Sequence, residues 1–487
     1  MTARAIMLMG TGSDVGKSLI AAGLCRAFAN RGMKVRPFKP QNMSNNAAVT
    51  EDGGEIGRAQ ALQARAARVP ASVHMNPVLL KPETATGAQV IVQGQRAATM
   101  TAKDYFRNRP QFMPAILDSF HKVADEADLV IVEGAGSPGE INLRDGDLAN
   151  MGFAHAAHLP ALLVGDIHRG GVIASIAGTF HILPPEDRAL LKGFIINKFH
   201  GDPDLFSEGK AFLERETQTP CLGIVPYFPL ASRLPAEDAV ALEEALSSAS
   251  GAFKISVLRL PRIANFDDLD PLRQEPGVSV HFVQSGEAIP ADTRLVIIPG
   301  SKSTMADLAA LRREGWDIDL ASHIRRGGHV LGLCGGYQML GRMVHDPEGL
   351  EGPAGSAAGL GHLDVETTLL PEKTLTRASG RHVASGALLE GYEIHLGHTD
   401  GADCARPFSM IGNRADGAFS ANGRVAGTYL HGCFSSDQFR SAFLAALGAE
   451  TSGLTYDHAV DAALDALAQH LEAHLDMSRI LALAEPV

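Results

Sequence analysis

The stretch GTGSDVGKS at residues 10–18 decides how the first half of the chain is expected to fold. It follows an apolar run at residues 5–9 and opens a helical pattern at residues 18–29. A glycine-rich turn between a strand and a helix directs successive backbone N–H groups toward one point, where the helix dipole adds positive charge. We therefore predict a phosphate-binding loop in preference to an ordinary glycine-rich turn.

Each part of this loop has an expected role in binding ATP. Lys17 should reach the outer phosphates, and the Ser18 hydroxyl should bind Mg²⁺. The spacing is one residue longer than in the standard phosphate loop, because the first glycine stands at position 10. This longer form resembles dethiobiotin synthetase and its relatives, which share the pattern GT-x-x-x-VGK[ST]. The expected ATP-binding residues of the loop are Gly12, Val15, Gly16, Lys17 and Ser18.

Short apolar runs recur along the first half of the chain. They are continuous and not alternating, as expected for strands that are buried on both faces of a parallel sheet. Helical stretches such as residues 55–67 lie between them, so the succession predicts a doubly wound α/β domain. The predicted strands are residues 5–9, 129–133, 161–166, 193–197 and 222–226.

The composition changes at residues 235–251, which are rich in Ala, Glu and Ser. New apolar runs follow, and a chain of 487 residues is too long for one ordinary core. We therefore predict a nucleotide-binding domain at residues 1–234, a second α/β domain at 252–448 and a helical tail at 449–487. The predicted strands of the second domain are residues 254–260, 294–299, 329–333 and 425–430.

Two polar residues end strands of the first predicted sheet. Glu133 precedes the glycine-rich stretch GAG, and a carboxylate at this edge beside a phosphate loop is well placed for Mg²⁺. The alternative is a solvated acid in a glycine-rich turn. Asn197 ends a later strand, and a capping role is the alternative there. The resemblance to dethiobiotin synthetase implies that Glu133 binds the metal and that Asn197 contacts the adenine of ATP.

The stretch GLCGG at residues 332–336 places Cys334 between a predicted strand and a helical pattern. This is the layout of a nucleophile elbow with Cys in place of Ser, in which small neighbours let the chain turn sharply and expose the sulfur. The helix that follows favours a thiolate and brings backbone N–H groups to an oxyanion. The flanking glycines argue against a merely structural buried cysteine.

Cys334 needs a general base, and the stretch TYLHG at the end of a later strand offers His431. The pair resembles class I glutamine amidotransferases, which implies a flavodoxin-like or α/β-hydrolase-like glutaminase domain with an oxyanion hole at Gly300 and Gly335. Many such enzymes read H-x-E, but position 433 is Cys433 here. Either a catalytic dyad acts, or a group from elsewhere in the chain orients the histidine.

Other features narrow the function classes. The net charge of −12 gives no electrostatic footprint for nucleic acid, and no apolar run approaches the ~18 residues of a membrane helix. Five widely spread cysteines fit a reducing cytoplasm better than a disulfide framework or a zinc cluster. His395 and His398 lack an evident third ligand, which favours loop or interface roles over a metal site.

An ATP site and a glutaminase in one chain suggest that ATP activates a carboxylate and that ammonia from glutamine converts it to an amide. The chain resembles the glutamine-dependent cobyrinic acid amidotransferase group, and in detail the cobyric acid synthase family. His168 and His200 depart from the residues common in that family. The motifs that carry the resemblance are KPQNMS (39–44), DGGEIGRAQ (52–60), NPVLLKP (76–82), EGAGSPGEINLR (133–144), GDIHRGG (165–171), INKFHGD (196–202), LPRIANF (260–266) and the two glutaminase motifs.

This resemblance implies a ligase of cobalamin biosynthesis. It would amidate the b, d, e and g carboxylates of adenosylcobyrinic acid a,c-diamide to give cobyric acid, using L-glutamine and ATP with Mg²⁺. Two alternatives stay open: a cobyrinic acid a,c-diamide synthase, and a partitioning-type scaffold ATPase with an inactive glutaminase domain. Since the corrin carboxylates are anionic, basic residues in the motifs are candidate contacts for substrate or phosphate, or else solvated charges. They are Lys39, Arg58, Lys81, Arg144, Arg169 and Lys198.

Overall fold

The computed structural model describes residues 2–82, 87–235 and 252–487, and these form two compact units. Unit 1 contains Met1–Ser44, Thr50–Leu234 and Val460–Val487. Unit 2 contains Asn45–Val49 and Pro235–Ala459. Most of the Ala/Glu/Ser-rich stretch that was expected to separate two domains lies outside the described residues.

Unit 1 is built on a parallel sheet in the order β12-β11-β10-β1-β9-β2. All five predicted strands of this sheet are confirmed, although their ends differ by up to two residues. The sixth strand, β2, was not predicted because its sequence VRPF is short and interrupted by Arg and Pro. The strands are β1 (Arg4–Gly10), β2 (Val35–Phe38), β9 (Leu129–Glu133), β10 (Ala161–Asp166), β11 (Leu191–Phe199) and β12 (Cys221–Pro226).

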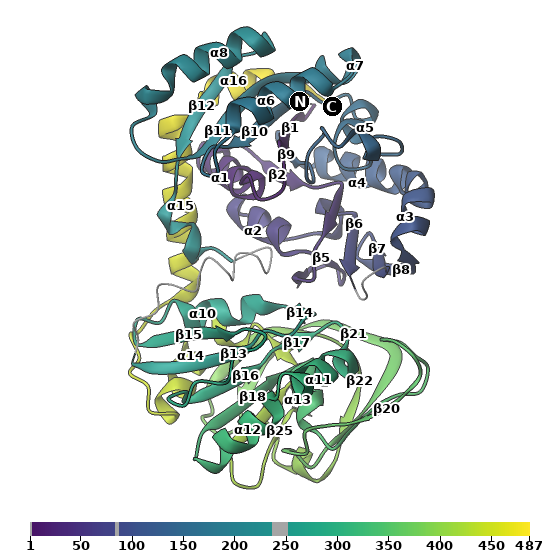
Figure 1. Ribbon diagram of the computed structural model, residues 1–487, viewed down its shortest axis with the longest axis vertical. Coiled ribbons are helices and arrows are strands. Elements are labelled where there is room, and N and C mark those ends of the chain that lie inside the picture. The colour runs from purple at the N-terminus through teal and green to yellow at the C-terminus, as the bar shows by residue number, and fades with distance from the viewer. Residues whose placement is uncertain (1, 83–86, 236–251) are drawn as a thin grey trace. The chain divides into compact units, whose positions relative to one another are not determined.

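Helices flank this sheet, as Figure 1 shows. Met7 and Met9 of β1 pack with Phe120 of α4 (Met113–Asp125) and Ile176 of α6 (Val172–Ile182) in one core cluster. The helix α1 (Lys17–Asn30) follows the phosphate loop and packs against α2 (Arg58–Ala66). Further helices of unit 1 include α3 (Ala102–Asn108), α5 (Met151–Ala156), α7 (Pro185–Arg188), α8 (Ser207–Thr217) and α16 (Met477–Leu483).

The predicted helix at residues 55–67 begins later than expected, because Glu55–Gly57 forms the short strand β5. Gly57 is extended (φ −61°, ψ 146°), so the helical turn starts only at Arg58. A small sheet absent from the sequence prediction lies nearby in the order β3-β6-β7-β8. Its strands are β3 (Gln41–Met43), β6 (Val78–Pro82), β7 (Gly87–Val92) and β8 (Gln95–Thr101).

The predicted tail contains the helices α15 (Tyr456–His474) and α16, and it ends in the strand β28 (Glu485–Pro486). Residues from Val460 onward belong to unit 1, where Arg26 of α1 bonds Asp465 at 2.7 Å. The strand β28 pairs antiparallel with Arg4 and Ala5 of β1, so the two chain ends lie side by side (Figure 1). Within the described ranges, no helix is long and apolar enough to cross a membrane.

Unit 2 contains a second, mostly parallel sheet in the order β15-β13-β16-β18-β26-β25. The predicted strands at residues 254–260, 294–299 and 329–333 are confirmed as β13, β16 and β18. The strands are β13 (Phe253–Leu258), β15 (Val278–Val283), β16 (Leu295–Ile298), β18 (His329–Leu333), β25 (Ala418–Phe419) and β26 (Val425–Thr428). The helices beside them include α11 (Thr304–Arg313), α12 (Trp316–Arg325), α13 (Gly335–Leu340) and α14 (Asp437–Ala446).

The strand predicted at residues 425–430 is two strands that belong to different sheets. After β26 the chain passes Tyr429 and forms β27 (Leu430–His431), which pairs antiparallel with β22 (Leu388–Asp400). The strand β22 forms a long hairpin with β21 (Glu366–His382), and neither strand was predicted. This change of sheet determines where His431 lies.

Candidate active sites

The phosphate loop connects β1 to α1 and depends on one glycine. Gly16 has φ +94°, a left-handed conformation that glycine adopts without strain. A Cβ on Gly16 would lie 2.2 Å from Nδ2 of Asn197, so a larger residue has no room. Lys17 is nearly buried, and its Nζ donates to the carbonyls of Gly12 at 2.9 Å and Gly136 at 3.1 Å. The Lys17 ammonium therefore bonds backbone carbonyls of the loop and of the segment after β9.

The carboxylate of Glu133 lies at the start of α1 and is completely buried. Its Oε1 accepts hydrogen bonds from the Ser18 hydroxyl at 2.7 Å and from Lys39 Nζ at 2.8 Å. On the other side, Oε2 accepts from Nε2 of Gln63 at 2.6 Å. The tertiary structure thus brings together Ser18, Glu133 and Lys39, three of the residues singled out in the sequence.

This arrangement fits a magnesium ion. Mg²⁺ prefers hard oxygen ligands and binds through one or two protein carboxylates, with substrate phosphates and waters completing its octahedron. The Ser18 hydroxyl and the Glu133 carboxylate supply such oxygens beside the loop. Lys39 balances the Glu133 charge in this buried setting. The sequence interpretation missed Gln63, although Gln60 and Gln63 lie one turn apart on α2 and Gln60 closes the family motif at residues 52–60.

Asn197 and Lys198 hold the phosphate loop from the end of β11. Nδ2 of Asn197 donates to the carbonyl of Val15 at 2.8 Å, and Nζ of Lys198 donates to that of Asp14 at 2.6 Å. Lys198 also pairs with Asp166 at 3.0 Å and has a left-handed backbone (φ +59°). Both side chains therefore position the loop backbone here. The roles expected of them, adenine recognition and substrate contact, remain predictions.

The other basic candidates have different surroundings. Lys81 is fully buried and pairs with Glu55 at 2.6 Å, so in this state its role is internal. Arg144 forms a two-pronged bond to Asp187 at 2.7 and 2.8 Å, and this hydrogen bonding raises the pKa of the Arg144 guanidinium. Arg58 is partly buried at the first turn of α2, whereas Arg169 is exposed.

In unit 2, Cys334 occupies a sharp turn between β18 and α13. Its backbone has φ +52° and ψ −109°, a conformation that costs a non-glycine residue about 1–3 kcal/mol and is found at functional sites. The turn needs its glycines, because a Cβ on Gly336 would lie 2.0 Å from the carbonyl oxygen of Ile298. The Cys334 side chain is nearly buried, and its Sγ lies 3.6 Å from the carbonyl oxygen of Ile394.

A third residue completes the site, and the sequence interpretation did not identify it. Asp268 accepts a hydrogen bond from Nδ1 of His431 at 2.6 Å and a second from the Gly432 backbone at 2.5 Å. It lies on the short helix η7 (Phe266–Leu269), 163 residues before the histidine. An acid from elsewhere in the chain therefore contacts the histidine, which is one of the two possibilities left open by Cys433. The one signal was the position of Asp268 two residues after the end of the family motif at residues 260–266.

The electrostatics of His431 follow from this pairing. The ring and the carboxylate are both almost completely buried. Burial opposes a positive charge, but the Asp268 carboxylate outweighs it, and the nearby Cys334 adds to the effect, so the pKa of His431 is raised. Nε2 of His431 makes no hydrogen bond of ordinary length to the described residues, and the contribution of Cys334 to the raised His431 pKa indicates that the thiol lies close to the ring.

Two backbone segments meet at this histidine. The strand β17 (Gly300–Ser301) pairs with β14 (Ile263–Ala264), which directly precedes the helix of Asp268. A Cβ on Gly300 would lie 3.2 Å from Cε1 of His431, and one on Gly335 would lie 3.0 Å from the Ser301 nitrogen. The glycines expected to form the oxyanion hole are therefore brought close together. That the N–H groups of both glycines donate hydrogen bonds to the oxyanion remains a prediction.

His395 and His398 occupy different environments on β22. The ring of His395 stacks on Tyr429 with centroids 3.8 Å apart, and burial lowers its pKa to about 4. His398 is exposed. In the described part of the chain, no three His, Cys, Asp or Glu side chains are grouped so that they could hold a metal ion. Both histidines lie within the strand β22, so the loop role expected for them is wrong, whereas the interface role stays a prediction.

Two family descriptions match the two halves of the chain. Residues 6–241 match the CobQ/CobB/MinD/ParA nucleotide binding domain, and residues 254–439 match the CobB/CobQ-like glutamine amidotransferase domain. The predicted fold class, an α/β chain with a phosphate-loop domain and a glutaminase domain, is thereby confirmed.

Curated relatives match over nearly the full length. A cobyric acid synthase of Cereibacter sphaeroides is 61% identical over 480 residues, which cover 99% of each chain. A cobyric acid synthase of Methylocella silvestris is 60% identical over 479 residues, 98% of this chain and all of the relative. Among solved structures, PurLQS from Thermotoga maritima matches 44% of this chain and 98% of its own with 15% identity and a TM-score of 0.31, a likeness too weak to carry an argument.

Proposed function

The chain belongs to the cobyric acid synthase family, and from this we propose that it amidates the b, d, e and g carboxylates of adenosylcobyrinic acid a,c-diamide to give cobyric acid. Glutamine supplies the nitrogen and ATP the driving force, so the enzyme is a glutamine-hydrolysing amide ligase. The identity of about 60% over the whole chain supports the assignment.

The observation that carries the proposal is the buried Asp268–His431 pair beside Cys334. A triad of nucleophile, base and orienting acid supports an active glutaminase and argues against an inactive scaffold domain. The Cys334 thiolate attacks the amide carbon of glutamine, and Gly300 and Gly335 stabilise the oxyanion. Imidazolium His431 donates its Nε2 proton to the departing nitrogen, so ammonia leaves and a thioester remains. Neutral His431 then takes a proton from the water that hydrolyses this thioester to glutamate.

The phosphate loop supports the second half of the reaction. A substrate carboxylate oxygen attacks the γ-phosphorus of ATP, and ADP leaves. Ammonia then attacks the acyl carbon, and phosphate departs to leave the amide. Lys17 would contact the outer phosphates once it exchanges the carbonyls of Gly12 and Gly136 for a ligand. The residues that would hold Mg²⁺ are Ser18 and Glu133, and the ion would neutralise charge that develops on the phosphates.

The five cysteines, none of them in a disulfide, agree with the proposed cytoplasmic location.

The test is mass spectrometry of adenosylcobyrinic acid a,c-diamide and, separately, of cobyrinic acid, each incubated with the protein, ATP, Mg²⁺ and glutamine. Four successive acid-to-amide conversions that end at cobyric acid are expected. Conversion of cobyrinic acid at positions a and c, with the diamide unchanged, would identify an a,c-diamide synthase instead. Folded, ATP-binding protein that converts neither substrate would contradict the proposal.

A further inference from the structure

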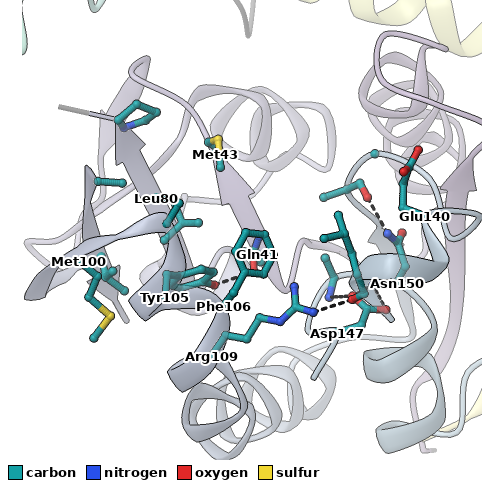
Figure 2. Close-up of a pocket in the computed structure, with 18 of the residues that line it drawn as sticks. Gln41, Met43, Leu80, Met100, Tyr105, Phe106, Arg109, Glu140, Asp147 and Asn150 are labelled. Carbon is teal, nitrogen blue, oxygen red and sulfur yellow. Dashed lines mark hydrogen bonds between the residues drawn. The ribbon is translucent and has the colours of Figure 1, made fainter. Parts of the chain in front are cut away.

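Unit 1 contains a cavity of about 390 Å³ beside the small sheet (Figure 2). Met43 of β3, Leu80 of β6 and Met100 of β8 contribute side chains from the sheet. Phe106 of α3 and the loop that follows β9, including Gly136, form other parts of the wall. Phosphate binding by the loop requires neither this small sheet nor α3, so it does not explain why the cavity is present.

The mouth of the cavity is apolar and open to solvent. Met43 is 58% exposed, Phe106 46% and Leu143 38%, and all three line the cavity. Ile141, two residues before Leu143, is 53% exposed. Large apolar side chains that gather around a cavity and stay exposed mark a binding surface, whereas scattered ones do not. The ligand therefore presents a broad apolar surface.

Two buried polar atoms in the lining have no partner among the described residues. Arg109 is only 7% exposed, and its Nε, a donor, makes no hydrogen bond. Its terminal nitrogen donates to the carbonyls of Leu143, at 2.5 Å, and Asp145. Asn150 is similar: its Nδ2 donates to the Ala135 carbonyl at 2.6 Å, which leaves Oδ1, an acceptor, unpaired.

Figure 2 shows Arg109 extending past Phe106 toward the loop that carries Asp147 and Asn150. Its guanidinium carbon lies 4.8 Å from the centre of the Phe106 ring, so the ring and the neighbouring loop hold the side chain in place. Buried polar groups normally have a partner, because an unpaired one costs about 1–3 kcal/mol. A ligand with oxygen and N–H groups on an otherwise apolar body would satisfy both atoms.

The cavity adjoins the phosphate loop within the same unit. Gly136 lines it, and the Gly136 carbonyl accepts the hydrogen bond from Nζ of Lys17. Glu133, which bonds Ser18, lies three residues earlier on the same segment. A group that enters this end of the cavity is thus close to the lysine expected to contact the phosphates.

We propose that this cavity binds one edge of the corrinoid substrate and directs a side-chain carboxylate toward the phosphate loop. The inference rests on the proposed function. The ring edge and its methyl groups pack on Met43, Phe106 and Leu143, while Nε of Arg109 donates to an oxygen of a peripheral arm. At about 390 Å³ the cavity is near the lower end of the ~300–1,000 Å³ range of ligand sites, so it holds an edge and not the whole macrocycle.

The experiment compares two matched phenylalanines of unit 1. Phe106→Ala removes the exposed ring at the cavity mouth, which lies under Arg109. Phe212→Ala is the control: Phe212 of α8 is 41% exposed, lies under Arg215 three residues on, and is not part of the cavity. Equilibrium dialysis of coloured adenosylcobyrinic acid a,c-diamide against each full-length protein gives the dissociation constant. A bound corrinoid would cover the Phe106 ring, so its removal in Phe106→Ala should weaken binding roughly tenfold or more, with Phe212→Ala unchanged.

Met43→Ser provides a second variant whose exposed position carries little risk to folding, and it should weaken binding in the same direction. Arg109→Lys keeps the charge but removes Nε; it should raise KM for the corrinoid and leave KM for ATP unchanged. Corrinoid affinities equal to wild type in both Phe106→Ala and Met43→Ser, while wild type still amidates the diamide, would overturn this inference and leave the proposed function intact. Wild-type protein that neither binds nor amidates the corrinoid would overturn both.

Discussion

Replacing Asp268 with Asn tests the most consequential contact in unit 2. The substitution keeps the size of the side chain but removes its charge from a contact of 2.6 Å with Nδ1 of His431, where both groups are nearly fully buried. The amide can also present an N–H to Nδ1, which would place the histidine proton on the wrong nitrogen. Glutamine hydrolysis should therefore fail although the fold is kept.

The size of the effect follows from the geometry. Two unit charges about 4 Å apart at an effective dielectric constant of ~20 interact by about 4 kcal/mol, which corresponds to roughly a thousandfold in rate. The equivalent substitution in the serine protease triad lowers kcat about 10⁴-fold. We therefore expect Asp268→Asn to lower glutamine-dependent kcat by about 10³- to 10⁴-fold. Activity with free ammonium should stay close to wild type, since Asp268 belongs to the glutaminase site.

The pH profile gives an independent check. Because Asp268 raises the pKa of His431, the imidazolium form persists to higher pH in wild type than an ordinary histidine allows. In Asp268→Asn the residual glutaminase activity should lose its protonated histidine at lower pH, so the alkaline limb moves toward acid. The assay is glutamate release and amide formation across pH, each with glutamine and with ammonium chloride. A glutamine-dependent kcat within tenfold of wild type would refute a positioning role for Asp268.

Three further substitutions test the remaining parts of the two sites. Cys334→Ser should abolish glutamine-dependent amidation by at least about 10³-fold while ammonium-dependent amidation continues; loss of both would count against two separate sites. Glu133→Gln should reduce ATP-dependent amidation by about 10- to 100-fold and raise the Mg²⁺ requirement, because Ser18 loses its carboxylate partner and Lys39 its counter-charge. Titration of Mg²⁺ against ADP release measures this effect, and an unchanged Mg²⁺ dependence would remove Glu133 from the metal site. Gly16→Ala should abolish ATP binding in calorimetry, since its φ is +94° and its Cβ would meet Asn197 at 2.2 Å. Gly178→Ala is the control, because a Cβ on this residue of the helix α6 meets nothing within 4 Å. The control variant should stabilise unit 1 by about 0.5–1 kcal/mol. Normal ATP binding by Gly16→Ala would contradict the steric argument.

Local sequence determined the features that need only neighbouring residues. The phosphate loop follows from the order strand, glycines, lysine and helix at residues 10–18, and the cysteine turn follows from the glycines around Cys334. Continuous apolar runs identified the buried parallel strands, since a strand covered on both faces has no polar side. These patterns lie within a few residues, where backbone geometry and side-chain size decide the outcome directly.

Tertiary structure alone decided which distant residues meet. The sequence predicted His431 but not Asp268, because η7 reaches the histidine only through the pairing of β14 with β17 and the switch of the chain from β26 into β27. In the same way, Gln63 meets Glu133 because α2 packs beside α1, and Lys39 meets Glu133 because β2, which ends just before Lys39, pairs with β9. The cavity at Phe106 depends on a small sheet with a weak apolar pattern in its edge strand β8. The order of the strands and the meeting of distant segments are set by packing of the whole unit, so short-range periodicity does not predict them.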